Sequence, residues 1–487
     1  MKRFTSIQSF RADFTASLVV FLVAVPLCVG VAVASGVPAE LGLVTGVVGG
    51  LLTGLLPGSS LQVSGPAAGL TVLVFEAVKE YGLGALGALV LAAGLLQLAM
   101  GALKLGRWFR AISVAVVQGM LAGIGLVLIA GQLYALTDAK APGTGLSNLA
   151  GLPGLVGDSM GSGTALSAFA IGAGTIAILV LWPRWRRAAR ILPAPLAAVA
   201  LSTLTVWALD LPVARVEVSG LLDAIQPPGL GDFGKLADVG VLGTVLAFAL
   251  IASAESLFSA AAVDRLHDGP RTDYDKELMA QGAGNTVCGL LGALPMTAVI
   301  VRSAANVQAG AKTKLSRVLH GVWLLVFAAA FPAALGVVPV AALAGVLVHA
   351  GWKLIPVRAL GPLWREHRGE ALVLMVTALA IVTVNMFEGV LIGLLLAVAK
   401  TAWETSHVHL EIHTPDDEEE PVQVRAVGNA TFLRLPKLLD QLETLPADRD
   451  VELDLSGLRH LDHACGAALT NWAEQHRRSR QTVELVS

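Results

Sequence analysis

The sequence predicts an all-α polytopic membrane protein that is followed by a small α/β cytoplasmic domain. The first observation is composition: of 487 residues, 55% are hydrophobic and only 14% are charged, too apolar for an ordinary soluble domain. The second is length, since a bilayer core about 30 Å thick needs about 20 apolar residues per helix, and runs of this kind recur. The third is a change to polar composition after Lys400.

Twelve of the predicted transmembrane segments are ordinary apolar runs. In the first half of the chain they are Phe14–Ala34, Leu41–Leu56, Gly84–Leu103, Ala111–Leu136, Ala165–Trp182 and Pro195–Leu209. After a polar stretch they resume as Val239–Ala260, Gly282–Leu294, Ser316–Leu335, Val340–Leu354, Ala371–Met386 and Gly389–Ala402. Two shorter segments rich in small residues, Gly65–Val78 and Ala298–Gly310, complete a set of fourteen.

The fourteen segments divide into two repeats of seven, about 12–210 and about 238–403, each with its short segment third. Because seven is odd, the second repeat must be inserted upside down relative to the first. Segment count and hydropathy carry this prediction, since the two halves share no clear residue identity. Inverted repeats with discontinuous helices are typical of transporters, whose sites lie near the membrane midplane where the short helices begin.

Cations in the connecting segments predict the orientation. They fall into two alternating sets, one of twenty and one that holds only Lys79, Lys140, Arg215 and Lys235. By the positive-inside rule the larger set is cytoplasmic, together with both termini. This split appears only when the two short segments count as crossings, which supports the number fourteen.

The C-terminal part predicts a separate small domain after the transmembrane domain at 1–403. Residues 404–421 are polar and contain an acidic run, so we expect a solvated linker. Residues 422–487 then alternate strand-like and helical patterns. The expected elements are a strand at Val422–Ala426, a helix at Leu435–Thr444, a strand at Val451–Leu455, a helix at Ala464–His476 and a strand at Thr482–Val486.

Glu255 and Arg302 are the two charged residues that we place in the apolar interior. A charge at mid-bilayer costs about 2.5–3.5 kcal/mol even on lenient scales, so such residues usually line a cavity, a relay or a substrate path. One anion and one cation therefore indicate a charged solute. The alternative is that Arg302 reaches the interface or pairs with Glu255 for structure alone.

The first short segment predicts an anion site at a helix start. Pro66 fits the first turn of a helix, Ser64 is placed to cap that turn, and Gly65 lets a solute approach the backbone. In the matching segment Arg302 falls near the start of the second short helix. Two helix N-termini that face each other beside a guanidinium would attract an anion; the alternative is an ordinary capped helix start.

Glu255 lies about mid-way along the eighth segment, and Ser259 lies one turn further on, so both can face one cavity. Three roles remain open for this carboxylate. It carries a proton, it helps to hold a coupling cation, or it only neutralises Arg302.

With these residues in view, the chain resembles the sulfate permease (SulP) family of anion transporters and exchangers over nearly its whole length. The motifs that carry the resemblance are Val25-Pro26, Ala34–Pro38, Gln62–Pro66, Ala254–Ser259, Asp275–Leu278, Gln281-Gly282, Asn285, Arg302-Ser303 and Gly310–Thr313. The resemblance implies two inverted seven-helix repeats, a core that moves against a gate, a homodimer and a C-terminal STAS domain.

Carried over by position, the anion pocket of the family maps to Leu27, Val31, Ser64, Gly65, Pro66, Ala67, Glu255, Val301, Arg302 and Ser303. Some members bear a Gln where Leu27 stands, so this pocket should be less polar on its first helix. Some sodium-coupled bicarbonate members carry an Asp where this chain has Ser259. That difference weakens a sodium mechanism, and Glu255 with Ser259 remains the expected place for a coupling ion or proton.

The tail resembles a shortened STAS domain through Leu453–Gly457 and Leu461–Cys465. The Ser that is phosphorylated in soluble relatives is not evident, so we expect no phosphorylation switch there. The Asp462-His463 pair and the stretch Val299–Ser303 are similar to a bacterial branch often associated with carbonic anhydrases, which favours bicarbonate.

These inferences predict a secondary active transporter of small anions in a bacterial cytoplasmic membrane. Bicarbonate is favoured, with sulfate or a dicarboxylate as alternatives, and transport uses proton or cation symport or anion exchange. The competing hypotheses are a nucleobase-type permease of the same fold and an anion channel or sensor. We expect no enzyme, cofactor, metal or nucleic-acid partner, because the sequence has no nucleophile–base pair, metal-ligand cluster or phosphate loop, and its three cysteines form no CxxC pair.

Overall fold

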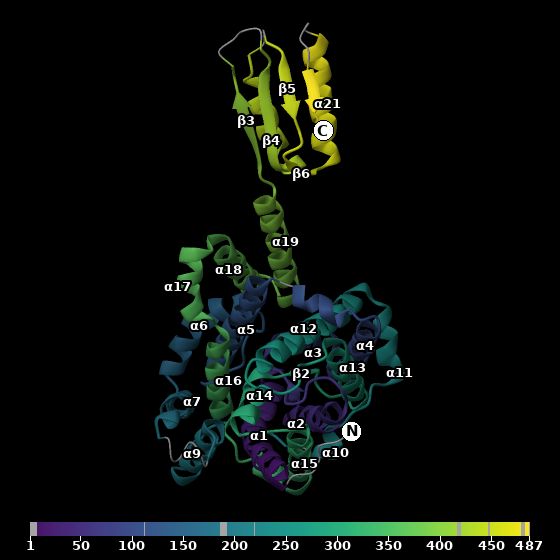
Figure 1. The fold of residues 1–487 in the computed structure, drawn as a ribbon. Helices are drawn as coiled ribbons and strands as arrows, with labels where there is room; N and C mark the ends of the chain where they lie inside the picture. The colour runs from purple at the N-terminus through teal and green to yellow at the C-terminus, as the bar shows by residue number, and fades with distance from the viewer. Residues whose placement is uncertain are drawn as a thin grey trace. The chain divides into compact units, whose positions relative to one another are not determined.

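The structure is a computed structural model that describes residues 7–111, 113–185, 192–218, 220–415, 420–446, 449–478 and 483–486. Most of the acidic run at 416–420 and the basic cluster at 186–190 lie outside these described residues. The chain forms two compact units, Met1–Gly393 and Leu394–Ser487. The first unit is built from helices, and the second contains a sheet (Figure 1).

Each of the fourteen predicted segments overlaps a helix, although the bounds differ. In the first repeat these are α1 (Ile7–Ala34), α2 (Ala39–Val48, with a π-helical turn at Gly49–Thr53), α3 (Thr71–Tyr81), α4 (Leu83–Ala102), α5 (Val114–Ala135), α7 (Gly163–Leu181) and α9 (Ala194–Ala208). In the second repeat they are α12 (Val239–Val263), α13 (Tyr274–Leu290), α14 (Ile300–Gln308), α15 (Leu315–Ala330), α16 (Val340–Leu354), α18 (Arg368–Thr383) and α19 (Met386–Thr405). The connections hold α6 (Gly145–Met160), α10 (Leu221–Ala224), α11 (Leu230–Gly234) and α17 (Val357–Glu366).

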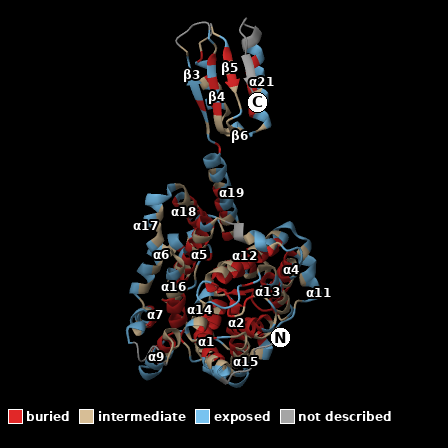
Figure 2. Ribbon diagram, viewed as in Figure 1, coloured by how far each residue is buried: buried red, intermediate tan, exposed pale blue. Residues whose placement is uncertain are grey.

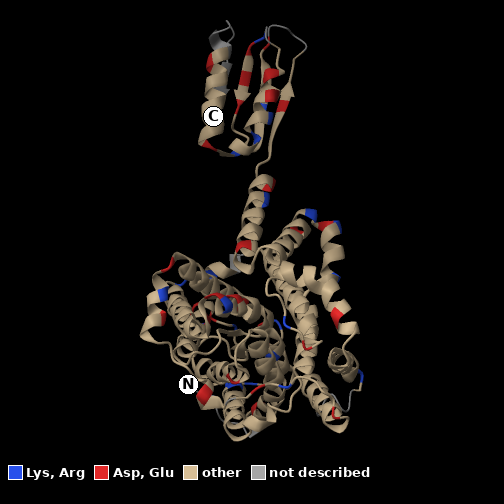
Figure 3. Ribbon diagram, turned by 180° about the vertical axis from the view of Figure 1, so that it is seen from behind, with Lys and Arg blue, Asp and Glu red and all other residues tan. Residues whose placement is uncertain are grey.

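Seven helices among the described residues are long and apolar enough to cross a membrane, and three apolar helices are shorter, Ala39–Thr53, Ala194–Ala208 and Leu315–Ala330. The helix α4 illustrates why these segments fold as they do. It is composed mainly of Leu, Ala and Gly and carries no charge, and Leu and Ala are strong helix formers. Charged residues are correspondingly sparse along the helices of the first unit (Figure 3).

The helices of the two repeats interlock in two bundles (Figure 1). In one, α4 packs against α12 and α13, and α1 packs against α2 and α15. In the other, α5 packs against α16 and α18, and α7 packs against α9 and α16. We call the set α1–α4 with α12–α15 the core bundle, and the set α5, α6, α7 and α9 with α16–α18 the gate bundle. They meet where α1 contacts α9 and α16, and buried residues run through both (Figure 2).

Two short strands replace the helix start that the sequence predicts at Ser64 and Pro66. The strand β1 (Ser64–Pro66) pairs antiparallel with β2 (Met296–Ala298), so that Gly65 lies opposite Thr297. The expectation that Ser64 caps a helix beginning at Pro66 was therefore wrong. Ala67 is still extended (φ −107°, ψ 134°), and helical structure begins with a 3-10 turn at Ala68–Leu70.

The strands form because backbone groups of one repeat make hydrogen bonds with backbone groups of the other repeat at this point. The N–H of Val299 donates to the carbonyl of Val63 at 2.9 Å, beyond the strand pair itself. Because the segment is buried, each backbone group needs a partner, and the matching segment of the other repeat supplies it. The β1–β2 pair thus fixes the starts of α3 and α14 relative to each other.

The second unit contains the sheet order β3-β4-β5-β7, with β6 paired to β4. Its strands are β3 (Val408–His413), β4 (Val422–Ala430), β5 (Val451–Asp454), β6 (Leu458–Leu461) and β7 (Val483–Val486), and its helices are α20 (Leu435–Glu443) and α21 (His463–Arg478). Only β3 and β4 pair antiparallel. Buried Leu438, Leu442, Leu453 and Trp472 form its core.

The predicted linker at 404–421 is shorter than expected, because α19 continues to Thr405 and residues 408–413 form the edge strand β3. Leu410 is 5% exposed and packs into the core of the second unit. The apolar side chains of this strand alternate with His and Glu. That alternation is the pattern of a half-buried strand, and we had attributed these polar residues to a linker.

Candidate functional site

A cavity with about 80 Å³ of space open to water-sized molecules lies beside the starts of α14 and of the Ala68–Leu70 turn. Its lining residues are Leu27, Val31, Pro66, Ala68, Gly69, Val117, Met120, Leu121, Glu255, Phe258, Ser259, Val299, Ile300, Val301, Arg302, Ala350 and Leu354. They come from both bundles. Since about 10–15 Å³ of such space holds one water, the cavity has room for a few waters or one small anion.

Arg302 is the cation of this cavity. It is the third residue of α14 and is 1% exposed. Its Nη2 donates to the carbonyl of Pro66 at 3.3 Å, whereas Nε and Nη1 have no acceptor among the residues that the structure describes. A buried cation with unused donors is costly unless an anion or water meets them. The guanidinium therefore favours a negatively charged group within hydrogen-bond distance of Nε and Nη1.

Gly65 provides the space that the guanidinium occupies. A Cβ atom at Gly65 would overlap Nη1 of Arg302 and would lie 3.3 Å from its Cζ. The close approach depends on the absence of a side chain at this position. Strand β1 therefore shapes one wall around Arg302.

Glu255 lines the same cavity from α12, where it is partly buried. Its Oε2 is shielded from solvent and has no hydrogen-bond partner within the described ranges of the chain. A Cβ atom at Gly69 would lie 2.8 Å from that oxygen, so another glycine permits the close packing. Glu255 and Arg302 line the same cavity but form no ion pair with each other in the described part of the chain.

The start of α14 adds positive potential to the cavity. Val299 precedes the helix in an extended conformation and supplies no side-chain cap. The first amides of a helix have no partner within it, and they carry a partial positive charge. Ile300 and Val301 are 37% and 40% exposed and line the cavity. A negatively charged group is therefore favoured at this point.

The structure brings together six of the ten predicted pocket residues. Leu27, Val31, Pro66, Glu255, Val301 and Arg302 line the cavity, as does Ser259, which we had predicted with Glu255 for a coupling ion. Ser64, Gly65, Ala67 and Ser303 do not line it.

The other four lie behind the cavity wall and support it. Ser64 Oγ accepts a hydrogen bond from Gln281 Nε2 at 2.8 Å. Ser303 Oγ accepts from the N–H of Val63 at 2.9 Å and donates to the Val299 carbonyl at 2.7 Å. Two serines therefore tie the β1–β2 region to α13 and α14, while Ala67 is buried.

Sequence reasoning missed the gate-bundle side of the cavity. Val117, Met120 and Leu121 of α5 and Ala350 and Leu354 of α16 are apolar residues within apolar helices, so no pattern distinguishes them. Phe258, by contrast, belongs to the motif Ala254–Ser259, and Gly69 belongs to the short segment Gly65–Val78, so those two patterns could have located them.

The interior also holds charges beyond Glu255 and Arg302, so the prediction of only two was wrong. Glu277 and Arg317 are each 1% exposed. Both oxygens of Glu277 accept hydrogen bonds, from the N–H of Ser59 and from Gln281 Nε2, each at 2.7 Å. Arg317 donates to the carbonyls of Ser59 and Thr53. Through these bonds Glu277 and Arg317 join parts of the protein to one another, and neither residue lines the cavity that Glu255 and Arg302 share.

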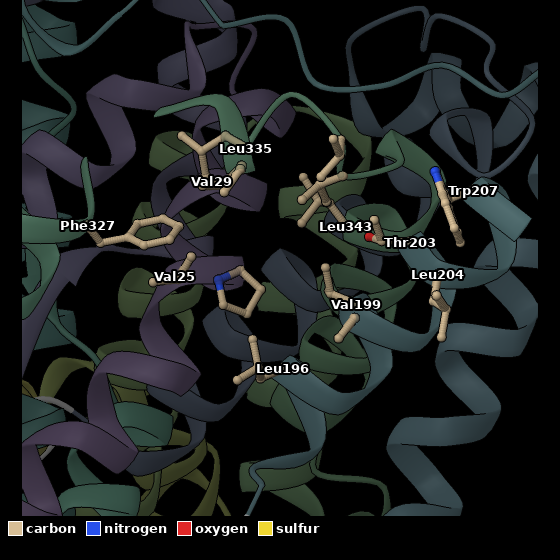
Figure 4. Close-up of a pocket in the computed structure, with 15 residues that line it drawn as sticks. Val25, Val29, Leu196, Val199, Thr203, Leu204, Trp207, Phe327, Leu335 and Leu343 are labelled. Carbon is tan, nitrogen blue, oxygen red and sulfur yellow. The ribbon is translucent and has the colours of Figure 1, made fainter. Parts of the chain in front are cut away.

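A larger cavity of about 470 Å³ lies between α1, α9, α15 and α16 (Figure 4). It is lined by Val25, Val29, Val199, Phe327, Leu343 and similar residues, with Thr203 and Trp207 as its polar contributors. A charge moved into such surroundings would lose its hydration and gain few partners. This cavity is unsuited to a charged solute, despite its size.

Asn285 of α13 supports the site from below strand β2. Its Nδ2 donates to Gln97 Oε1 at 2.7 Å and to the Met296 carbonyl at 3.1 Å, and its Oδ1 accepts from the Met296 N–H at 2.7 Å. We expect Asn285→Ala to lower the thermal unfolding temperature in detergent, because each buried group left unpaired costs about 1–3 kcal/mol. Thr286→Ala is the matched control, since Thr286 bonds only its own helix at Gly282; equal unfolding temperatures for both variants would contradict this role.

Residues 10–377 match the profile of the Sulfate permease family. The chain belongs to the sulfate permease family. Residues 413–487 match a Mlab-type STAS domain, as the sequence predicted for the tail. The bicarbonate transporter BicA of Synechocystis sp. is 26% identical over 470 residues, which cover 88% of this chain and 79% of the relative. YvdB of Bacillus subtilis, described as a candidate sulfate transporter, is 27% identical over 503 residues, which cover 99% of this chain and 92% of the relative.

Solved structures show the same sulfate permease fold. Murine Slc26a9 in the inward-facing state aligns with a TM-score of 0.79 at 15% identity, covering 100% of this chain and 86% of that one. The transmembrane domain of a cyanobacterial BicA aligns with a TM-score of 0.67 at 24% identity, covering 81% of this chain and 98% of that one. The predicted membrane fold and its STAS domain are thus confirmed, and these relatives are transporters rather than enzymes.

Proposed function

We propose that this protein is a secondary active transporter of small anions. The observation that carries the proposal is Arg302, a buried cation whose Nε and Nη1 lack acceptors beside a small cavity at a helix start. A transported anion would meet those donors. A neutral nucleobase gives no reason to bury a cation, which argues against the nucleobase alternative. The names of the relatives, a bicarbonate transporter and a candidate sulfate transporter, support the same class.

In this proposal the anion lodges between the start of α14 and the Ala68–Leu70 turn. Arg302 and the first amides of α14 attract it, and Leu27 and Val31 exclude water around it. Val117 and Leu354 come from the gate bundle, so the shape of the cavity depends on the relative positions of the two bundles. A shift of the core bundle against the gate bundle then exposes the site to one side of the membrane.

The small volume favours a compact inorganic anion over a dicarboxylate, and bicarbonate is the substrate we favour. The distribution of cations supports a bacterial cytoplasmic membrane with both termini in the cytoplasm. The sulfate permease family membership supports a homodimer and, for a bicarbonate carrier, a functional link to carbonic anhydrase.

Glu255 is the proposed coupling residue, by proton or cation. We expect Glu255→Gln in proteoliposomes to lose anion accumulation driven by an imposed proton or sodium gradient, because the amide neither titrates nor attracts a cation. A coupling energy of 1–3 kcal/mol corresponds to a loss of about 5- to 150-fold in driven uptake. Anion exchange without a gradient should persist, since Arg302 is intact.

Ser259→Ala is the matched control, because it removes a neighbouring polar group without removing charge. Tracer uptake under each gradient identifies the coupling ion. If Glu255→Gln accumulates the anion at the wild-type rate under a gradient, Glu255 is not the coupling residue. That result would not affect the proposed anion site at Arg302.

A further inference from the structure

The helix α17 (Val357–Glu366) lies at the surface of the gate bundle and has no buried residue. It is separated from α16 by Ile355 and Pro356, and it packs against α18. Because proline lacks an N–H, Pro356 ends the transmembrane helix and lets the chain turn. The helix α17 is therefore a separate element rather than the end of a membrane span.

The side chains of α17 divide into an apolar face and a basic face. Val357, Leu360 and Trp364 share one face at spacings of three and four residues, given 3.6 residues per turn. Val357 is 53% exposed and Trp364 is 47% exposed. Arg358 and Arg365, seven residues apart, share another face and are both exposed. An exposed apolar face beside a basic face is typical of a helix that lies in the membrane interface.

The cations around α17 have no partner among the described residues. Lys353, Arg358, Arg365 and Arg368 are exposed and make no hydrogen bond or ion pair through their side chains. Against these four stand only two carboxylates, Glu366 and Glu370, which leaves a local excess of two positive charges. This charge is complementary to the phosphates of anionic lipids, which attract basic segments at a membrane surface.

We propose that α17 lies in the headgroup layer of the cytoplasmic leaflet and binds anionic phospholipid. Val357 and Trp364 enter the acyl boundary, and Arg358 and Arg365 contact lipid phosphates. The helix α16, which α17 follows after two residues, ends at Leu354 in the wall of the cavity. We further infer, on the basis of the proposed function, that bound anionic lipid holds the gate-bundle wall of the site in place. The lipid thereby raises the rate of anion transport.

A label on α17 tests lipid binding independently of transport. Gly361→Cys is suitable, because a Cβ atom at Gly361 meets nothing within 4 Å, and Cys28, Cys288 and Cys465 are buried. The full chain, labelled with an environment-sensitive fluorophore, is reconstituted in phosphatidylcholine vesicles with increasing phosphatidylglycerol. We expect quenching by lipids brominated near the headgroup to increase with phosphatidylglycerol and to weaken with salt.

The arginines are then removed in the labelled protein. We expect Arg358→Gln and Arg365→Gln each to raise the phosphatidylglycerol needed for half-maximal quenching about fivefold. Arg265→Gln, an exposed cation in the connection between α12 and α13, should leave quenching unchanged. A label that stays exposed to water in every vesicle would overturn the proposal and favour a protein partner for α17. Quenching that does not change with the phosphatidylglycerol content would also overturn the proposal.

Transport provides a separate arm. Uptake that rises with phosphatidylglycerol in wild type but not in the double arginine variant supports the link to the site. If quenching increases with phosphatidylglycerol but anion uptake does not change, the link between lipid binding and the site is overturned. Absence of anion uptake from every vesicle would refute the proposed function and leave the quenching result standing.

Discussion

Arg302→Ala should strongly weaken saturable anion uptake while the protein stays folded. The guanidinium is the buried cation of the cavity, and two of its nitrogens lack acceptors in the part of the chain that the structure describes. Its removal takes away charge-assisted hydrogen bonds of about 2–3 kcal/mol, which corresponds to a loss of about 30- to 150-fold in apparent affinity. Tracer uptake in proteoliposomes across a range of anion concentrations measures this loss.

Arg302→Lys is the control that separates charge from shape. A lysine keeps the charge but lacks the planar fork of donors, so uptake should recover only in part. Folding is checked by thermal unfolding in detergent, because Arg302 donates to Pro66 and contributes to the local structure. Wild-type affinity in a folded Arg302→Ala protein would show that the anion binds elsewhere.

Gly65→Ala should weaken anion transport strongly without unfolding the protein. The added Cβ would overlap Nη1 of Arg302, and the guanidinium is the far end of a flexible side chain, so it moves rather than the backbone. A displaced guanidinium no longer meets the anion, and we expect at least about a tenfold loss of apparent affinity.

Two other glycines make this test selective. A Cβ atom at Gly174 meets nothing within 4 Å, so Gly174→Ala should behave as wild type. A Cβ atom at Gly49 would lie 2.5 Å from the backbone oxygen of Ser64, which cannot give way, so Gly49→Ala should lower the unfolding temperature. Unchanged uptake by Gly65→Ala would contradict the position of Arg302 against strand β1.

The helices of this protein could be predicted from sequence because the bilayer imposes length and hydropathy on each of them. The charges Glu255 and Arg302 stood out for the same reason. The β1–β2 pair could not be predicted in this way, because Ser64–Pro66 is too short to show an alternating pattern. Its hydrogen bonds join residues more than two hundred positions apart, and local propensity carries no information about them.

Buried charges show a second limit. Arg317 is one of the twenty cations that the positive-inside rule assigns to the cytoplasmic connections, yet it is buried in the folded protein and bonded to Ser59. The sequence shows that a charged residue is present, but it does not show whether the folded chain will bury that residue and supply a hydrogen-bond partner. Val117 and Ala350 show a third limit, since an apolar residue in an apolar helix gives no sign of whether it faces lipid, a neighbouring helix or a cavity.

The most direct test of the account is tracer uptake by the full chain in proteoliposomes, comparing bicarbonate, sulfate, fumarate and uracil under imposed proton and sodium gradients. The account predicts saturable, gradient-driven uptake of at least one anion, bicarbonate foremost, and none of uracil. Uptake of uracil alone, or of no solute from a well-folded preparation, would contradict it.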